Sequence, residues 1–270
     1  MKRLMQVDCS DILQELESWY ARDNGPYLFR ATRAAALELI DTAFGYHILQ
    51  LGLHGEQALC DGSPINHRLF CSQRYGPGVN VVTDPDELPF DSDSVDVVIA
   101  HHCLEFARNP HQVLREIQRV LTPQGQLLVI GFNPYSLSGA RMQIRRLMRD
   151  PLWTAHRPVG EHRLTDWLHL LNCEVIQTRR LYGLPPMGSG RVRQWMTRAD
   201  TWTARHKLPI DGLFILHAVK QVAAAHKPRK VWRGRRARLI SLVPKPVTTP
   251  VTRKVFSGVK PATDAGNAAA

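Results

Sequence analysis

The sequence predicts an α/β fold in which helices cover both faces of a mostly parallel sheet. Four apolar segments, at residues 47–51, 79–82, 95–100 and 126–131, are nearly continuous rather than alternating, which is typical of parallel strands buried on both faces. A helical pattern joins the last two segments, and such a strand, helix and strand form a right-handed parallel crossover. The length of 270 residues suggests one domain of ordinary size with a tail, or two small domains.

Two helices are predicted before the first strand. Apolar side chains recur there at helical spacing: Ile12, Leu13, Leu16, Trp19 and Tyr20. The Asp-Asn-Gly-Pro sequence at 23–26 ends this pattern, and a second helix is expected over residues 27–43. Residues 1–44 are therefore predicted to be helices that pack on the domain.

The helix before the strand at 126–131 carries clear start and stop signals. Asn109 can cap this helix, Pro110 suits its first position, and Gln112 completes a possible capping box. The Thr-Pro-Gln-Gly sequence at 122–125 is expected to end the helix in a turn. Other elements are predicted with weaker signals: strands at 67–70, 174–178 and 214–219, and helices at 141–149, 165–171 and 191–206.

The positive charge of the chain is concentrated at its C-terminal end. The formal net charge is +11, and eleven basic residues against one acidic residue after His226 account for +10 of it. This sequence shows no hydrophobic period, so residues 223–270 are predicted to be a disordered basic tail. Such a tail could contact nucleic acid or another polyanion without sequence preference.

The composition favours a cytoplasmic protein with reduced cysteines. No apolar run approaches the roughly 20 residues that span a bilayer, and the N-terminus lacks the apolar core of a signal peptide. The five cysteines show no CxxC pairing. His101, His102 and Cys103 adjoin one another but lack a second ligand pair, so no metal is predicted.

More specific sequence blocks begin at Asp84. Residues 84–99 contain D-P-D-E-L-P-F and V-D-V-V, residues 101–106 read H-H-C-L-E-F, and residues 114–125 read L-R-E-I-Q-R-V-L-T-P-Q-G. In this order the blocks resemble those of class I S-adenosylmethionine-dependent methyltransferases of the type 11 domain family. The resemblance covers roughly residues 45–220.

The resemblance implies a Rossmann-like domain at residues 45–222. The expected sheet is doubly wound, mostly parallel and seven-stranded, with a β-hairpin end formed by the strands near Cys173 and Phe214. The implied cofactor is S-adenosyl-L-methionine. The implied reaction is methyl transfer to an acceptor that the sequence does not identify.

Four residues occupy positions at which the family binds its cofactor. Gly52 falls on a glycine of the cofactor loop, and Asp84 would accept a hydrogen bond from the adenine amino group. Leu88 would pack near the adenine ring, and His101 would border the methyl-donor pocket. Ligands bind beyond the carboxyl ends of parallel strands in such sheets, which suits these positions. Alternatively, Asp84 starts a turn with Pro85.

The glycine-rich loop departs from the family pattern. Gln50 replaces the usual acid, and His54 and Glu56 replace two glycines that let the backbone approach the cofactor. Two functions from different classes are therefore carried forward. The first is a methyltransferase, and the second is a catalytically silent domain of the same fold that serves as a binding module with a basic tethering tail.

Other candidate sites have structural alternatives. His101, His102 or Glu105 could act as a general base, or could cap a strand and pack under a loop. The Asn-Pro-Tyr sequence at 133–135 resembles a motif of enzymes that methylate amide or adenine nitrogens, but it follows a different strand, so a turn is favoured. The arginines of 141–149 could meet phosphate or carboxylate, or could form a solvated helix face.

Overall fold

The computed structural model describes most of the domain, namely residues 9–22, 25–53, 58–181 and 212–221. The helix expected at 191–206, the tail expected at 223–270, and loop residues His54 and Glu56 lie outside the described residues. The predicted domain boundaries and the predicted role of the tail therefore stay predictions.

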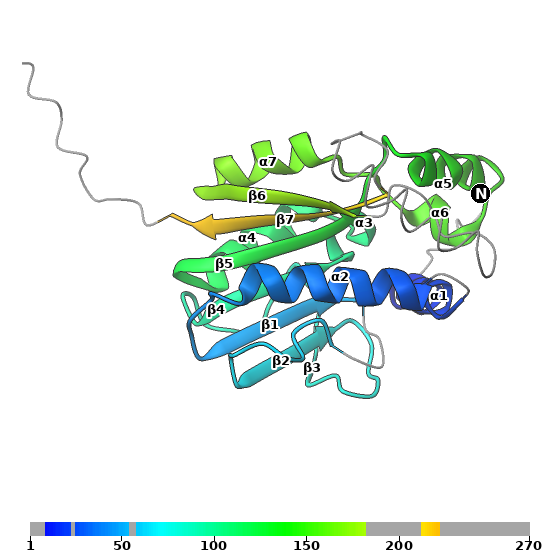
Figure 1. The fold of residues 1–270 in the computed structure, drawn as a ribbon. Coiled ribbons are helices and arrows are strands. Elements are labelled where there is room, and N and C mark those ends of the chain that lie inside the picture. Colours follow the sequence, from blue (N-terminus) through cyan, green and yellow to red (C-terminus); the bar gives the residue numbers. More distant parts are fainter. Residues whose placement is uncertain (1–8, 23–24, 54–57, 182–211, 222–270) are drawn as a thin grey trace, which may run out of the picture. The chain divides into compact units, whose positions relative to one another are not determined.

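One seven-stranded sheet forms the centre of the described part of the chain, in the order β3-β2-β1-β4-β5-β7-β6 (Figure 1). The strands are β1 (His47–Gly52), β2 (His67–Ser72), β3 (Val81–Val82), β4 (Val95–His101), β5 (Leu121–Phe132), β6 (Cys173–Leu181) and β7 (Leu213–Lys220). The first five strands are parallel to one another, whereas β7 runs antiparallel between β5 and β6. The predicted doubly wound, mostly parallel sheet with an antiparallel end is confirmed.

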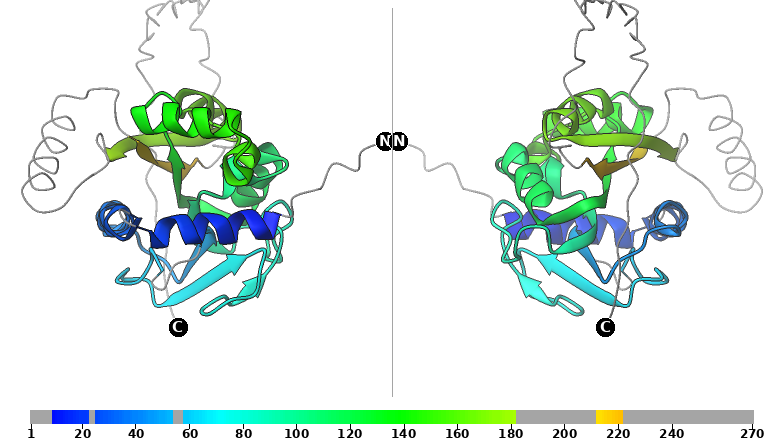
Figure 2. Two further views of the ribbon diagram at one scale, coloured as in Figure 1. Left: turned by 90° about the vertical axis from the view of Figure 1, so that its right-hand side faces the viewer. Right: turned by 90° about the vertical axis from the view of Figure 1, so that its left-hand side faces the viewer.

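Helices cover both faces of the sheet. They are α1 (Cys9–Ala21), α2 (Gly25–Ile40), α3 (Cys103–Phe106), α4 (Pro110–Val120), α5 (Leu137–Leu147), α6 (Pro151–Ala155) and α7 (Glu161–Leu170). One core cluster joins α1, α2 and α6 to one face, and a second joins α3, α4 and α7 to the other. In the left view of Figure 2, α1 (dark blue) crosses the edge at which the parallel strands end.

Adjacent residues of each central strand face opposite core clusters. In β1, Ile48 belongs to the first cluster and Leu49 to the second. In β4, Val97 and Val98 divide in the same way, and all four side chains are fully buried. Burial on both faces is the reason that these strands read as continuous apolar segments.

The start of α4 matches the expected capping signals. The side-chain oxygen of Asn109 accepts a hydrogen bond from the Gln112 backbone N–H at 3.4 Å, and Pro110 occupies the first turn. Proline has no backbone N–H, and the first helical turn needs none. This local prediction is confirmed.

The segment at 122–125 differs from the expected turn. The structure includes it in β5, which begins at Leu121 and pairs with β4 in a register that shifts between Val95 and Val97. Gln124 has φ 66°, so the backbone turns sharply at this residue and then continues in the same strand. Pairing with the neighbouring strand extends β5 toward its N-terminal end, beyond this irregular segment. Local sequence signals do not contain such pairing.

Charged residues of the family-like blocks hold the loops of the domain together. One carboxylate oxygen of Asp96 accepts hydrogen bonds from the backbone N–H groups of Tyr46 and His47, at 2.7 and 3.0 Å, and so fixes the entry to β1. On α4, Arg119 donates to the carbonyl oxygens of Leu88 and Phe90, at 2.9 and 2.8 Å. Within this chain, these contacts are a structural reason for the charged residues at these positions of the blocks.

Candidate functional site

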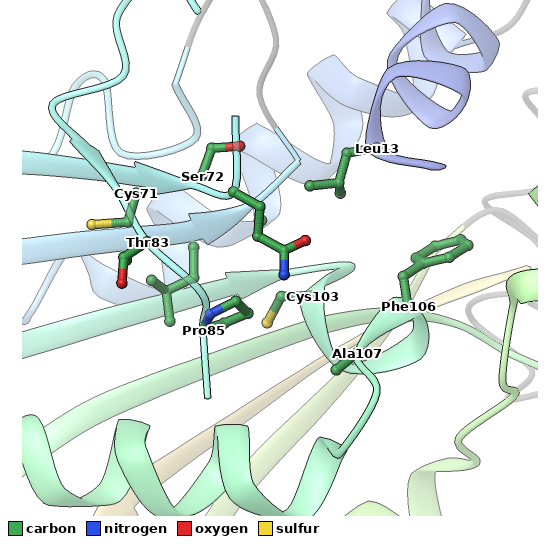
Figure 3. Close-up of a pocket in the computed structure, with 11 residues that line it drawn as sticks. Leu13, Cys71, Ser72, Thr83, Pro85, Cys103, Phe106 and Ala107 are labelled. Carbon is green, nitrogen blue, oxygen red and sulfur yellow. The ribbon is translucent and has the colours of Figure 1, made fainter. Parts of the chain in front are cut away.

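A cleft lies at the carboxyl ends of β1, β2 and β4, which is where ligands bind in doubly wound sheets. Its central cavity is lined by backbone and side chains of several elements, among them Gly52, Ser72, Cys103 and Phe106 (Figure 3). Leu13 of α1 points into this cavity from the opposite side. The central cavity has a volume of only about 20 Å³, which is room for about one water molecule.

Gly52 brings the ends of β1 and β4 into close contact. It lies beside His101 in the strand register and has φ +99°. A Cβ atom on this residue would overlap the carbonyl oxygen of His101 and approach Cys103. The backbone N–H of Leu53 donates to the same carbonyl at 3.0 Å. Only glycine fits this backbone, and its small size lets β1 and β4 end in close contact beside the cleft.

Gln50 holds the two sides of the loop that follows β1. Its side chain is fully buried. The side-chain oxygen accepts from the Leu59 N–H at 2.8 Å, and the side-chain amide donates to the Leu53 carbonyl at 3.3 Å. An amide can make both bonds because it carries a donor and an acceptor, whereas a carboxylate would only accept. Gln50, which stands where the family pattern has an acid, can therefore hold together the residues on either side of this loop.

The ends of β2 and β3 supply polar groups at one end of the cleft. Ser72 and Gln73 line the central cavity, as do Thr83 and Pro85 on either side of Asp84. The Gln73 amide donates to the Asp84 carboxylate at 2.8 Å, and Asp84 is exposed at the rim. Gln73 was not singled out from the sequence, although its position directly after a strand end could have identified it.

Leu88 and His101 lie behind the cleft. Leu88 is buried in the second core cluster, and its N–H donates to Glu116 at 3.0 Å. His101 is fully buried, with Nδ1 3.4 Å from the carbonyl oxygen of Leu53 and no hydrogen-bond partner for Nε2 among the described residues. Burial, aided by the neighbouring His102, holds the pKa of His101 well below its ordinary value. Their predicted cofactor roles stay predictions.

A buried polar network joins α1 to the region after β4. The Tyr20 hydroxyl lies 2.6 Å from Nε2 of His102, and Nδ1 of His102 lies 2.7 Å from the Glu105 carboxylate. The other Glu105 oxygen accepts from the Phe132 N–H and lies 3.7 Å from Nε2 of His156. These groups are nearly inaccessible to solvent, so they do not form an open acid–base site.

Glu105 is held as a carboxylate despite its burial. Burial by itself would raise the pKa of Glu105, but the charge and hydrogen bond of His102, together with His156, outweigh it and lower the pKa to about 2. The two thiols in the cleft behave differently, since burial raises the pKa of Cys71 and Cys103 to about 12. Both cysteines are therefore neutral thiols at physiological pH and poor nucleophiles.

The remaining candidates occupy structural positions. The Asn133 side chain accepts from the Tyr135 N–H at 3.0 Å, which is the turn favoured by the sequence, and Ser136 then caps α5. Within the described residues, no three His, Cys, Asp or Glu side chains come together as metal ligands. In the same part of the chain, every helix is too short or too polar to cross a bilayer.

Two further cavities continue the cleft on either side. One, of about 240 Å³, shares Leu13 and Ser72 with the central cavity. The other, of about 460 Å³, shares Phe106 and Ala107 with it. Leu13 and Phe106 therefore each line two neighbouring cavities of this cleft.

The sheet order and this cleft define a class I methyltransferase fold. Residues 44–129 match the family model of a methyltransferase domain, the type 11 family. The described fold and this match over residues 44–129 confirm the resemblance to methyltransferase domains of the type 11 family that was seen in the sequence.

Individual proteins are also similar to this chain. The uncharacterized protein YafS of Escherichia coli K12 is 37% identical over 142 residues, which are 53% of this chain and 58% of that protein. A methyltransferase chain in complex with the Haloferax volcanii Trm112 activator has a TM-score of 0.57 at 20% identity, covering 80% of this chain and all of its own. A SAM-dependent methyltransferase from Thermotoga maritima has a TM-score of 0.55 at 16% identity, covering 78% and 97%. At these identities the two structures show the fold alone.

Proposed function

We propose that the domain binds S-adenosylmethionine in the cleft and transfers its methyl group to an acceptor. The observation that carries the proposal is the end of β1, where Gly52 lines the cleft with a backbone that only glycine adopts without strain, and Gln50 frames the following loop. Ligands bind at the carboxyl ends of parallel strands in such sheets, and this strand end is where the amino acid part of the cofactor would lie.

The polar groups around the cleft suit the rest of the cofactor. Ser72 and Gln73 can exchange hydrogen bonds with ribose hydroxyls, and Asp84 can accept from an adenine amino group once its bond to Gln73 rearranges. When bound, S-adenosylmethionine supplies an activated methyl group on a sulfonium ion. Transfer needs mainly alignment of the acceptor and exclusion of water, so this chain does not have to provide a nucleophile.

Leu13 is expected to limit cofactor binding. Small-molecule sites have volumes of about 300–1,000 Å³. The central cavity, at about 20 Å³, needs a displaced Leu13 to merge with its 240 Å³ neighbour. We therefore expect calorimetry to give a dissociation constant for S-adenosylmethionine on the order of 10–100 μM, or about −6 to −7 kcal/mol. Leu13→Ala should tighten binding by about fivefold, or roughly 1 kcal/mol.

Leu16→Ala is the matched control for this experiment. Leu16 lies on the same helix but belongs to the first core cluster, whereas Leu13 belongs to neither cluster. Leu16→Ala should lower stability and leave the affinity unchanged. Absence of heat with all three proteins at millimolar S-adenosylmethionine would reject cofactor binding and favour the catalytically silent binding module.

Asp84→Ala tests the adenine end of the proposed site. Loss of a carboxylate acceptor is expected to weaken S-adenosylmethionine binding by roughly 1–3 kcal/mol without unfolding the domain, because Asp84 is exposed. Asp86→Ala removes a neighbouring carboxylate and serves as the control. Equal affinities for the two variants and the unmodified chain would show that Asp84 only organises its turn.

Two sequence-based expectations accompany this proposal. A cytoplasmic location fits a chain with unpaired cysteines, and Cys60, Cys71, Cys103 and Cys173 are free. The basic sequence at 223–270 is proposed to contact polyanions through its charge of +10 after His226. Neither expectation depends on methyl transfer.

A further inference from the structure

The largest of the three cavities adjoins the central part of the cleft. It is formed by the N-terminal part of α1, the end of α3, and the segments before and after α6. Its volume of about 460 Å³ lies within the range of sites that bind small organic molecules. Phe106 and Ala107 belong to the walls of both cavities, so a ligand here would lie next to one at Gly52.

Three arginines line this cavity: Arg108, Arg149 and Arg157. No acidic residue lines it, and within the described part of the chain none of the three takes part in an ion pair. By contrast, Arg119 and Arg180 are each held by a glutamate at 2.8 Å. The described residues therefore do not compensate the positive charge of the cavity.

Arg157 is held in place by its surroundings. Its backbone N–H donates to the Glu105 carbonyl at 2.8 Å, and one guanidinium nitrogen donates to the Arg108 carbonyl at 2.8 Å. The Glu105 carboxylate does not neutralise it, because that carboxylate is buried and paired with His102. A guanidinium fixed at one nitrogen and open at the others suits a carboxylate or phosphate.

The other residues that line the cavity indicate the chemical character of the rest of the ligand. Ile12, Phe106, Pro151 and Ala155 present mostly carbon to the cavity. Arg108, Arg149 and Arg157 are exposed, and cations at the open side of a concave, largely apolar site attract anions from solution. We infer that this cavity binds the methyl acceptor, and that the acceptor is a small organic anion in which a carboxylate or phosphate is attached to an apolar body. The claim that the ligand is the methyl acceptor rests on the proposed function. The claim that the ligand is an anion rests on the cavity alone.

The anion site can be tested without the cofactor. Phenyl phosphate and the neutral benzyl alcohol serve as probes in calorimetry on the full chain. Phenyl phosphate should bind and benzyl alcohol should not. Each lost charge-assisted contact weakens binding by about tenfold, so Arg108→Gln with Arg157→Gln should weaken phenyl phosphate binding by about 100-fold.

Arg141→Gln with Arg146→Gln is the matched control. Both arginines are exposed on α5, neither lines the cavity, and the net charge falls by the same amount. This control should change the affinity by less than twofold. Equal losses in both double variants would mean general attraction to a basic surface and would overturn the inference, as would the absence of phenyl phosphate binding.

A second measurement separates the acceptor from the cofactor. Transfer of labelled methyl from S-adenosylmethionine should be found in the anionic fraction of a deproteinised metabolite extract, and should be lost in the Arg108→Gln and Arg157→Gln double variant. Labelling confined to neutral or cationic fractions would overturn the acceptor assignment. Phenyl phosphate binding with no S-adenosylmethionine binding would reject the methyltransferase while leaving the anion site in place.

Discussion

Glu105→Leu is expected to lower the free energy of unfolding by about 3–5 kcal/mol at neutral pH. Removing a buried carboxylate leaves its hydrogen-bonding partners without compensation, and for such buried paired groups the cost is typically of that size. The groups left without their partner are the His102 ring, whose Nδ1 lies 2.7 Å from the Glu105 carboxylate, and the Phe132 N–H. Because His102 also contacts Tyr20 of α1, the variant should loosen the helix that covers the cleft.

The same substitution is expected to remove part of the acid sensitivity of the protein. The pKa of Glu105 falls from 4.5 to about 2 in the folded protein, which corresponds to about 3 kcal/mol. For a carboxyl with a depressed folded pKa, this stability is present above the unfolded pKa and is lost as the pH falls. The difference between the unmodified chain and Glu105→Leu should therefore be largest above about pH 5 and shrink toward pH 2.

Urea unfolding at pH 7, 4 and 3 checks both effects. Glu38→Leu is the control, because Glu38 forms an exposed ion pair with Arg179 at 2.8 Å and should cost less than about 1 kcal/mol. The double variant with Glu105→Leu and His102→Leu should recover part of the loss, since no charge is then left alone. A Glu105→Leu variant as stable as Glu38→Leu would show that the buried network contributes little.

Gly52→Ala is expected to abolish measurable S-adenosylmethionine binding and to lower the free energy of unfolding by about 3 kcal/mol or more. Two causes add. The backbone has φ +99°, where a side chain is strained by about 1–3 kcal/mol, and the new methyl group would overlap the His101 carbonyl. Relief of that overlap must move the end of β1 away from β4, and this displaces the backbone proposed to face the cofactor.

Gly62→Ala separates these two causes. Gly62 has φ +100°, almost the same as Gly52, but a Cβ atom there would meet only Leu37, at 3.4 Å. This variant should cost about 1–3 kcal/mol and leave the calorimetric affinity for S-adenosylmethionine intact. If the two variants lose the same stability and retain the same affinity, the close approach of β1 and β4 is not important for the site.

Much of the domain could be predicted from local sequence. The buried strands read as continuous apolar segments, and the cap at Asn109 specified the start of α4. Short elements such as α3 and α6 were not expected, because four or five residues carry too little periodic signal. The extension of β5 back to Leu121 depends on pairing with β4, which is a long-range contact.

The candidate site was predicted less completely than the fold. Gly52 was singled out because it falls on a glycine of the family pattern, and its φ of +99° explains why this position is glycine. Leu13, Arg108 and Arg157 carry no local signature, whereas Gln73 directly follows a strand and Arg149 belongs to the arginine-rich segment noted in the sequence. Arg108 and Arg157 are 49 residues apart, and the hydrogen bond between them exists only in the folded chain.

The sequence by itself determined the class of fold, the resemblance to a methyltransferase family and the position of the glycine at the end of β1, because periodicity, caps and glycine positions are properties of short segments. The tertiary structure alone decided that Gln50 bridges the loop after β1, that Leu13 of α1 lines the cleft, and that Glu105 is an ionised group in the interior. Each of these depends on which distant groups surround a side chain. Burial, charge pairing and cavity shape arise from packing between segments, and a linear pattern does not encode them.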